Sequence, residues 1–315
     1  MKTPGTINAF RPNRLTDVFK SAIKALIFLV FFGCASFSYS QKNISINSPH
    51  ELTPVRGYYK LLESLSPDPK TSGNELDKII FPFDQAFADK VLGQKPVYLQ
   101  NITLGDFKIP APPANSSAQT RAELDYLLAL QHTRTPEDIR SSLYMSNVFD
   151  TPGDIGRSLG LWTGEQKLPL TDSLMDKVER DGDYFLWSLK FKYNRARPYM
   201  LDPKIRDLEE SRASSFPSGH VTYAYIRAYI YEEIVPEFTD FFEAQAIAMS
   251  HARQIIGVHY PSDCEGSRVF ARQFVNMLLQ NQRFNHDLEK VKKEWAAKAD
   301  ESFGKLSKKV VYSKN

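Results

Sequence analysis

Three clusters in the second half of the chain combine cationic side chains with two imidazoles and a carboxylate. In chain order they read Lys190 with Arg197-Pro198, then Pro217-Ser218-Gly219-His220, then Arg253, His259 and Asp263 in the spacing R-x5-H-x3-D. Guanidinium and ammonium groups bind phosphate oxygens, and a histidine oriented by a carboxylate is a nucleophile. The set predicts a site that holds a tetrahedral oxyanion and attacks it with histidine, as in a phosphate-monoester hydrolase that works without a metal.

The first cluster places two cations seven residues apart, which is two turns of a helix. Lys190 and Arg197 project from one face if the helix runs that far. Pro198 disfavours helical geometry at the residue before it, so we expect the helix to end near Arg197. A guanidinium fork and a compact ammonium together suit a phosphoryl group. Taken alone, such a pair is more typical of a solvated helix face.

The second cluster is predicted to begin a helix, because an apolar and aromatic stretch runs from Val221 to Ile234. Ser218 is the expected N-cap. Gly219 has no side chain to keep a ligand from the backbone, and the unpaired N–H groups at a helix start favour an anion. His220, in the first turn, is placed to give a proton to a leaving group. Without the other clusters, a capped turn with an incidental histidine would explain the pattern better.

The third cluster is predicted to supply the nucleophile. Pro261 favours the first turn of a helix, so His259 is expected just outside that helix. Asp263 can then reach one imidazole nitrogen and fix the tautomer, which leaves the other nitrogen to attack. Arg253 adds a second guanidinium for the phosphoryl oxygens. An isolated H-x3-D spacing is equally typical of a surface ion pair.

No metal site is predicted from these residues. A metal centre needs histidines and carboxylates at ligand spacing, and H-x3-D with one distant histidine is too little. The cationic side chains already supply the charge that a metal would provide. We therefore expect neither a metal nor another cofactor.

The order of the clusters, K-x6-RP, PSGH and R-x5-H-x3-D, resembles the signature of the type 2 phosphatidic acid phosphatase superfamily, which includes the vanadium haloperoxidases. Within it the chain is most similar to the bacterial class A non-specific acid phosphatases, over roughly residues 105 to 300. Three further segments carry that likeness: Leu127-Leu128-Ala129-Leu130-Gln131, Asp181-Gly182-Asp183 and Gly257-Val258-His259-Tyr260. The family usually has a serine where this chain has Ala252, which implies tuned rather than lost activity.

The resemblance implies a role for each motif residue. The catalytic residues would be His259, His220 and Asp263, and phosphate would be bound by Lys190, Arg197, Ser218, Gly219 and Arg253. The implied reaction is hydrolysis of phosphate monoesters through a phosphohistidine. Two alternatives stay open: a vanadate-dependent haloperoxidase, because vanadate mimics phosphate in the same cradle, and a phosphate-binding protein without turnover.

The elements that must position these residues are predicted to be helices. From Ala118 onward the apolar spacing is helical and strict strand alternation is rare. We expect helices at 120–132, 136–146, 151–160, 171–194, 218–234, 238–256, 262–280 and 283–303. The predicted fold is therefore all-α, a single helical-bundle domain with an N-terminal extension.

The first forty residues have the composition of a signal peptide. Basic residues precede an apolar run, Ala25 to Gly33, and small and polar residues end at Ser40. The run is too short to span a bilayer comfortably. Lipidation at Cys34 or a retained anchor are the alternatives. We expect a signal peptide at 1–40, an extension of unknown role at 41–104, the catalytic domain at 105–303, a polar tail at 304–315, and a periplasmic or secreted protein.

Charge and cysteine content limit the partners. Removing residues 1–40 takes away five basic residues and one acidic residue, so the formal charge of +3 becomes −1. A chain with so little net charge lacks the strongly positive electrostatic field that would attract nucleic acid. Only Cys264 would remain, so no intrachain disulfide can form. We expect small phosphate-monoester substrates as partners, no nucleic acid and no stable membrane span after signal removal. Whether the chain forms a homo-oligomer is left open.

Overall fold

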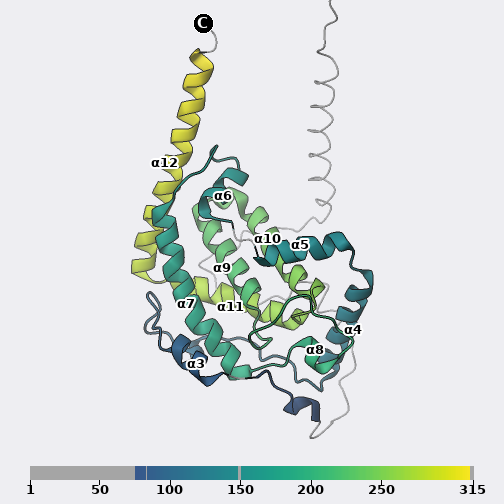
Figure 1. Ribbon diagram of the computed structural model, residues 1–315. Helices are drawn as coiled ribbons and strands as arrows, with labels where there is room; N and C mark the ends of the chain where they lie inside the picture. Colours follow the sequence, from purple (N-terminus) through teal and green to yellow (C-terminus); the bar gives the residue numbers. More distant parts are fainter. Residues whose placement is uncertain (1–74, 83, 148–149, 313–315) are drawn as a thin grey trace, which may run out of the picture. The chain divides into compact units, whose positions relative to one another are not determined.

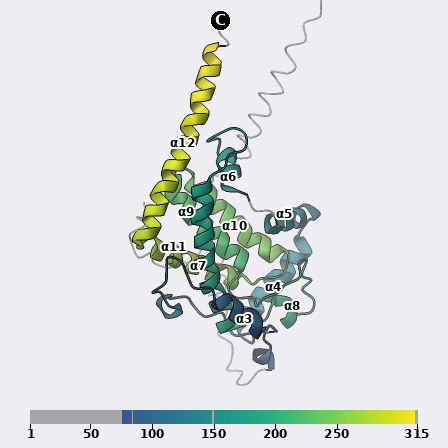
Figure 2. The same cartoon turned by 60° about the vertical axis from the view of Figure 1, so that its left-hand side comes forward.

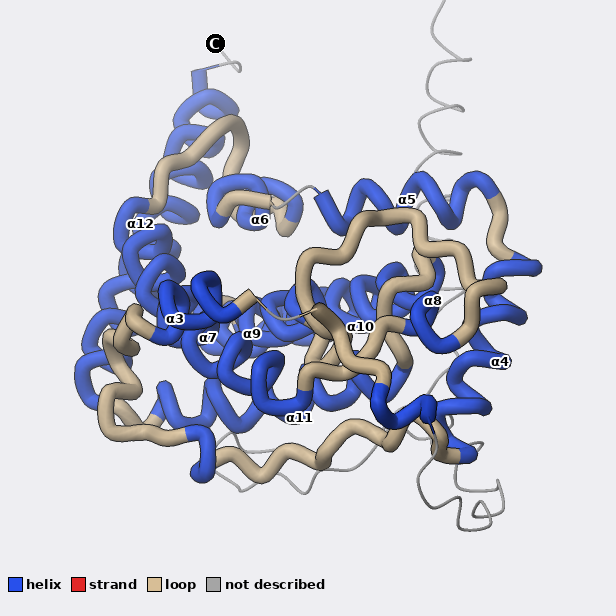
Figure 3. The backbone as a smooth tube through the Cα atoms, turned by 60° about the horizontal axis from the view of Figure 1, so that its bottom comes forward, coloured by secondary structure: helices blue, strands red, loops and turns tan. Residues whose placement is uncertain are grey.

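The structure is a computed structural model that describes residues 75–82, 84–147 and 150–312, with side chains to Ser302. The predicted signal peptide, Cys34, most of the extension and the end of the tail lie outside the described residues. Within them the chain forms helices and loops without a named strand (Figure 3). The all-α prediction is confirmed.

The centre of the fold is helix α9 (Gly219–Ile234), which packs against α10 (Thr239–Ile255) and α11 (Pro261–Leu279). Helix α7 (Pro169–Tyr193) runs beside α12 (Gln282–Tyr312) in both ribbon views (Figures 1 and 2). The remaining elements are η1 (Glu75–Lys78), α3 (Gln85–Leu92), η2 (Leu104–Asp106), α4 (Ala118–Thr133), α5 (Pro136–Asn147), α6 (Pro152–Ser158), α8 (Pro198–Leu201) and η3 (Pro236–Phe238). The motif-bearing helices thus share one core.

Hydrophobic burial holds this core together. Helix α9 is apolar or aromatic on almost every face, as expected of a helix surrounded by protein. Side chains from three helices meet in one cluster whose members include Phe185, Ile226, Phe270 and Phe274, each fully buried. Burying a side chain of this size contributes about 1.5–3 kcal/mol relative to leaving it exposed. The helices that carry the three sequence clusters are therefore packed against one another in this core.

The helix expected at 171–194 ends before Arg197, so it is too short to carry both Lys190 and Arg197 on one face. It ends at Tyr193, and Asn194 adopts a left-handed conformation with φ of 41°. The chain then turns, so Arg197 is the N-cap of α8 and does not lie on α7 with Lys190. Lys190 and Arg197 therefore do not project from one helix face, which was expected only if the helix reached Arg197. The two cations still meet, because Arg197 approaches the site from the loop after the turn.

Part of the N-terminal extension is anchored on α7. The backbone N–H groups of Tyr98 and Leu99 donate to Asp181 at 2.8 and 2.9 Å, and Val97 donates to the same carboxylate. Phe87 of α3 packs edge-on against Trp187, with ring centroids 4.8 Å apart. Residues before 105 thus brace the helix that carries Lys190. In the part of the chain that the structure describes, no helix is both long enough and apolar enough to cross a bilayer.

Candidate active site

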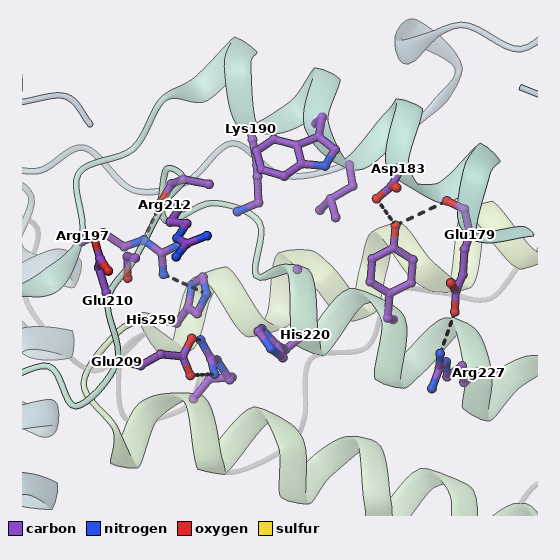
Figure 4. A pocket seen from close by; sticks show the side chains of 17 residues that line it. Glu179, Asp183, Lys190, Arg197, Glu209, Glu210, Arg212, His220, Arg227 and His259 are labelled. Carbon is purple, nitrogen blue, oxygen red and sulfur yellow. Dashed lines mark hydrogen bonds and ion pairs between the residues drawn. The ribbon is translucent and has the colours of Figure 1, made fainter. Parts of the chain in front are cut away.

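A pocket of about 570 Å³ lies where the three sequence clusters meet (Figure 4). Its wall contains six of the predicted site residues: Lys190, Arg197, Gly219, His220, Arg253 and His259. Ser218 and Asp263 are fully buried behind that wall. The structure therefore brings together all eight residues that the sequence pointed to.

The geometry around His259 fixes its tautomer. Its Nδ1 lies 3.3 Å from Oδ2 of Asp263, and its Nε2 lies 3.0 Å from Nη1 of Arg197. An arginine can only donate, so Nε2 accepts and Nδ1 carries the proton. Burial, followed by the charge of Arg197, lowers the pKa of His259 well below its usual value. The ring is thus neutral, with its lone pair on the nitrogen that faces the cations.

Asp263 is held by donors from several elements. Its Oδ1 accepts from Nη1 of Arg195 at 2.7 Å, while Oδ2 accepts from Ser215 Oγ at 2.5 Å and from the Tyr260 N–H at 2.9 Å. Burial alone would raise the pKa of Asp263, but the charge of Arg195 and the His259 hydrogen bond outweigh it. The pKa of Asp263 therefore lies well below its usual range. The carboxylate stays ionised and fixed in place.

Glu123 of α4 supports this arrangement from beneath. It is fully buried, accepts from Ser262 N–H at 2.8 Å and forms an ion pair with Arg195 at 3.3 Å. Sequence reasoning missed both Glu123 and Arg195. One signal existed for Glu123, because it lies on the same predicted helix as the buried Leu124 and Leu127, where an unpaired carboxylate is costly.

Backbone carbonyls orient the cationic side chains of Lys190 and Arg197. Lys190 Nζ donates to the carbonyls of Ser214 and Pro217 at 2.8 and 2.6 Å. Arg197 donates from Nη1 to the Val258 carbonyl at 2.7 Å, and its Nη2 has no partner among the described residues. Burial lowers the pKa of Lys190, as does Arg197, and burial lowers the pKa of Arg197 to about 10. Neither cation forms an ion pair with a carboxylate of the described residues, and two buried cations of this kind suit the binding of an anion.

The Ser218-Gly219 turn begins α9 as predicted, but Ser218 does not cap it through its side chain. Its Oγ is buried without a hydrogen-bond partner among the described residues. A Cβ placed on Gly219 would come no closer than 3.8 Å to a protein atom, so packing does not require glycine there. An unpaired hydroxyl beside the first N–H groups of a helix fits an oxyanion.

His220 is tied to α5. Its Nε2 lies 3.1 Å from the Ser146 carbonyl, which can only accept, so that nitrogen carries a proton. Burial and the charge of Arg253 lower the pKa of His220 to about 4. Ser146 also accepts a hydrogen bond from Arg253 at 2.7 Å through its hydroxyl. Sequence reasoning gave no indication of Ser146.

Residues 183–287 match the family model of the PAP2 superfamily. This part of the chain is similar to that superfamily. The match contains all three clusters, so the predicted resemblance is confirmed.

Curated relatives show the same likeness. A non-specific acid phosphatase of Providencia stuartii is 32% identical over 128 residues, covering 39% of this chain and 52% of the relative. An acid phosphatase of Zymomonas mobilis is 23% identical over 185 residues, covering 57% and 66%. A non-specific acid phosphatase of Salmonella typhi is 26% identical over 132 residues, covering 40% and 53%. The chain thus spans between about half and two thirds of the length of the curated relatives it matches.

Among solved structures, a transmembrane PAP2 type phosphatidylglycerolphosphate phosphatase from Bacillus subtilis is 18% identical. The likeness covers 52% of this chain and 85% of that one, with a TM-score of 0.38. A score of this size carries no argument about function.

The outer wall of the pocket is polar and partly aromatic. Asp183 accepts a hydrogen bond from the Tyr223 hydroxyl at 2.5 Å, and Glu179 pairs with Arg227 at 2.6 Å. Trp187 also lines the wall, although sequence reasoning had not named it.

The described residues contain no group of three or more histidines, cysteines, aspartates and glutamates that could hold a metal ion. Cys264 is buried with a free thiol. A buried free cysteine of this kind packs as a small hydrophobic residue.

Proposed function

We propose that this chain is an exported acid phosphatase that hydrolyses phosphate monoesters through a phosphohistidine on His259, without a metal. One observation carries the proposal: a neutral His259 with a fixed tautomer presents Nε2 to a pocket in which Lys190 and Arg197 form no ion pair with a carboxylate of the described residues. The acid phosphatases among the curated relatives support the same reaction class.

Substrate binding would use the surplus of positive charge. A phosphate monoester carries up to two negative charges, which Lys190 and Arg197 would neutralise. Arg253, the Ser218 hydroxyl and the first amides of α9 would complete the cradle. Phosphoryl transfer depends mainly on positioning and charge stabilisation, and these groups supply both.

The first chemical step would be an in-line attack on phosphorus. Nε2 of His259 forms the P–N bond while the bond from phosphorus to the ester oxygen breaks. Arg197, which donates to Nε2 in the free protein, would transfer that hydrogen bond to a phosphoryl oxygen. Asp263 would stabilise the positive charge that develops on the ring.

His220 would protonate the departing alcohol. Its pKa of about 4 applies to the free pocket, where Arg253 disfavours the imidazolium. A bound dianion favours the charged ring and raises that pKa. In the second step water attacks phosphorus, His220 takes the proton, and the P–N bond breaks to release phosphate.

A substrate panel under rapid quench tests the proposal. Aryl, nucleoside, sugar and lipid phosphates would be assayed across pH with and without chelator, and the trapped phosphoenzyme mapped by peptide sequencing. We expect an acid-labile, base-stable label on His259. A label on Ser218, or turnover without any phosphoenzyme, contradicts the mechanism.

Further assays distinguish the phosphatase from a haloperoxidase and from a phosphate-binding protein without turnover. Vanadate should compete with phosphate. Strong halide oxidation by the vanadate-loaded protein, with no phosphatase activity in the vanadate-free form, would indicate a haloperoxidase. Binding of p-nitrophenyl phosphate without cleavage would indicate a binding protein. Export through residues 1–40 is tested by sequencing the N-terminus of the protein recovered from the periplasm or medium.

A further inference from the structure

Arg253 already holds a carboxylate. Its Nη1 donates to Oε2 of Glu209 at 2.8 Å, and its Nη2 donates to Oε1 at 2.8 Å. Two parallel bonds of this kind are the geometry in which a guanidinium also binds two oxygens of a phosphoryl group. Glu209 therefore presents its two oxygens to Arg253 as a phosphoryl group would.

Little of Arg253 remains for a ligand while this pair is formed. Its Nη1 also donates to Ser146 Oγ, and its Nε is buried without a partner among the described residues. The side chain of Arg253 is 3% exposed, whereas that of Glu209 is 27% exposed. A phosphoryl group can reach the end of this guanidinium only when the carboxylate moves away.

The Glu209 carboxylate lies where the proposed function places the phosphoryl group. Burial raises its pKa, but hydrogen bonds and charge from Arg253, with His220 and Arg197 adding to them, hold the pKa below its usual value. These three residues are also proposed phosphoryl or leaving-group contacts. Figure 4 shows Glu209 at the same end of the pocket as His259 and Arg197, away from Asp183 and Glu179.

The formal charges at this end of the pocket also favour exchange of Glu209 for a phosphoryl group. Arg212 and Glu210 line this end of the pocket too, and their opposite charges cancel (Figure 4). The other charged groups that line or underlie it are four cations and three carboxylates: Lys190, Arg195, Arg197, Arg253, Glu123, Asp263 and Glu209. Their sum is +1 with Glu209 in place and +2 when it leaves. The second value matches a phosphate dianion.

Glu209 is also the carboxylate of this group that is able to leave. Asp263 and Glu123 are 0% exposed and receive hydrogen bonds from several elements. Glu209 lies in the loop between α8 and α9, and among the described residues its carboxylate is bonded to Arg253 alone. A rotation about its side-chain bonds would carry it to solvent.

We propose that Glu209 is an internal competitor, which occupies the Arg253 subsite in the free protein and is displaced by the substrate phosphoryl group. The inference rests on the proposed function of the same site. Its consequence is that each phosphate-like ligand binds more weakly than the cradle alone would allow, because binding must first break the Glu209–Arg253 pair.

The test compares Glu209→Gln with Glu210→Gln. Inhibition constants of inorganic phosphate and orthovanadate would be measured at about pH 6, where a free glutamate is ionised. We expect E209Q to lower both constants about tenfold, which corresponds to about 1.4 kcal/mol, and to lower KM in parallel. Glu210 also lines the pocket but has no ion pair among the described residues, so E210Q reports the effect of removing a nearby charge. We expect it to change the constants less than about twofold, given the screening of exposed charges.

In E209Q the amide could still bind Arg253, so Glu209→Ala is measured as well, because alanine cannot form that contact. Thermal unfolding of each variant checks that the fold is intact. Weaker phosphate binding in E209Q and E209A would mean that Glu209 positions Arg253 for the ligand, which overturns the inference. Equal changes in E209Q and E210Q would overturn it too, in favour of general repulsion. A wild-type protein that neither binds phosphate nor hydrolyses p-nitrophenyl phosphate would remove the proposed function and the inference with it.

Discussion

The two sides of the pocket differ in how firmly their side chains are held. On the nucleophile side, Asp263 and Glu123 are 0% exposed and are fixed by Arg195, Ser215 and backbone N–H groups. On the leaving-group side, the side chains of Arg227 and Glu179 are 29% and 38% exposed. The site is rigid around the attacking nitrogen and open around the departing group.

This difference has a physical reason in the reaction we propose. In-line attack depends on the distance and angle between one nitrogen and phosphorus, and small displacements there are costly. The leaving group differs from one monoester to another, so a loosely held wall admits many of them. A pocket built in this way would select strictly for the phosphoryl group and weakly for the rest of the substrate.

The largest expected effect comes from removing the nucleophile. His259→Ala should lower kcat/KM for p-nitrophenyl phosphate by about four orders of magnitude and abolish the phosphoenzyme, as expected for loss of a member of a nucleophilic triad. His251→Ala is the matched control, since His251 is an exposed histidine on the neighbouring helix α10. A phosphoenzyme in H259A would show that the nucleophile is not on the rigid side of the pocket.

The next effect tests the support beneath the nucleophile. Glu123→Gln leaves Arg195 with one ionised partner instead of two, and breaking a buried ion pair costs about 3–5 kcal/mol of unfolding free energy. We expect a fall in that range by chemical denaturation. Removing the exposed Glu137–Arg140 pair with Glu137→Gln should change stability too little to measure.

Catalysis should respond to the same network. Arg195→Lys cannot reproduce contacts from one guanidinium to two carboxylates, so kcat should fall about tenfold or more while KM changes little. A rise in KM with an unchanged kcat would instead place Arg195 in substrate binding, and the comparison between the two sides would lose its basis.

The effect expected for His220 depends on the leaving group and on pH. His220 must be protonated to donate, and its pKa in the free pocket is about 4, so kcat/KM for alkyl phosphates should decline as pH rises above that value. His220→Ala should slow alkyl esters about a thousandfold, because they need a general acid, and p-nitrophenyl phosphate much less. The variant should also lose the alkaline decline. Equal losses for both substrates would exclude His220 as the proton donor.

The smallest expected effect is that of metal removal. Exhaustive dialysis against EDTA should change kcat/KM less than about twofold, because side-chain cations supply the charge that a metal would otherwise provide. Loss of activity that returns on adding zinc or magnesium would show that the mechanism proposed for both sides is incomplete.

The sequence by itself determined where the main helices begin and which side chains could take part in the chemistry. Apolar periodicity gave eight helices whose observed starts agree to within about two residues, and Pro136, Pro169 and Pro261 each open a helix. The order of the three clusters indicated the superfamily that the comparisons support. These features are local or depend on spacing, so they can be read along the chain.

Only the tertiary structure decided which groups touch. The turn at Asn194 moves Arg197 off α7 and onto the nucleophile His259, and no spacing rule foretells that contact. Glu123 and Glu209 belong to no motif, yet one underlies Asp263 through Arg195 and the other covers Arg253. Their roles depend on how α4 and the loop before α9 pack, and packing is set by the shape of the whole core rather than by neighbours in sequence.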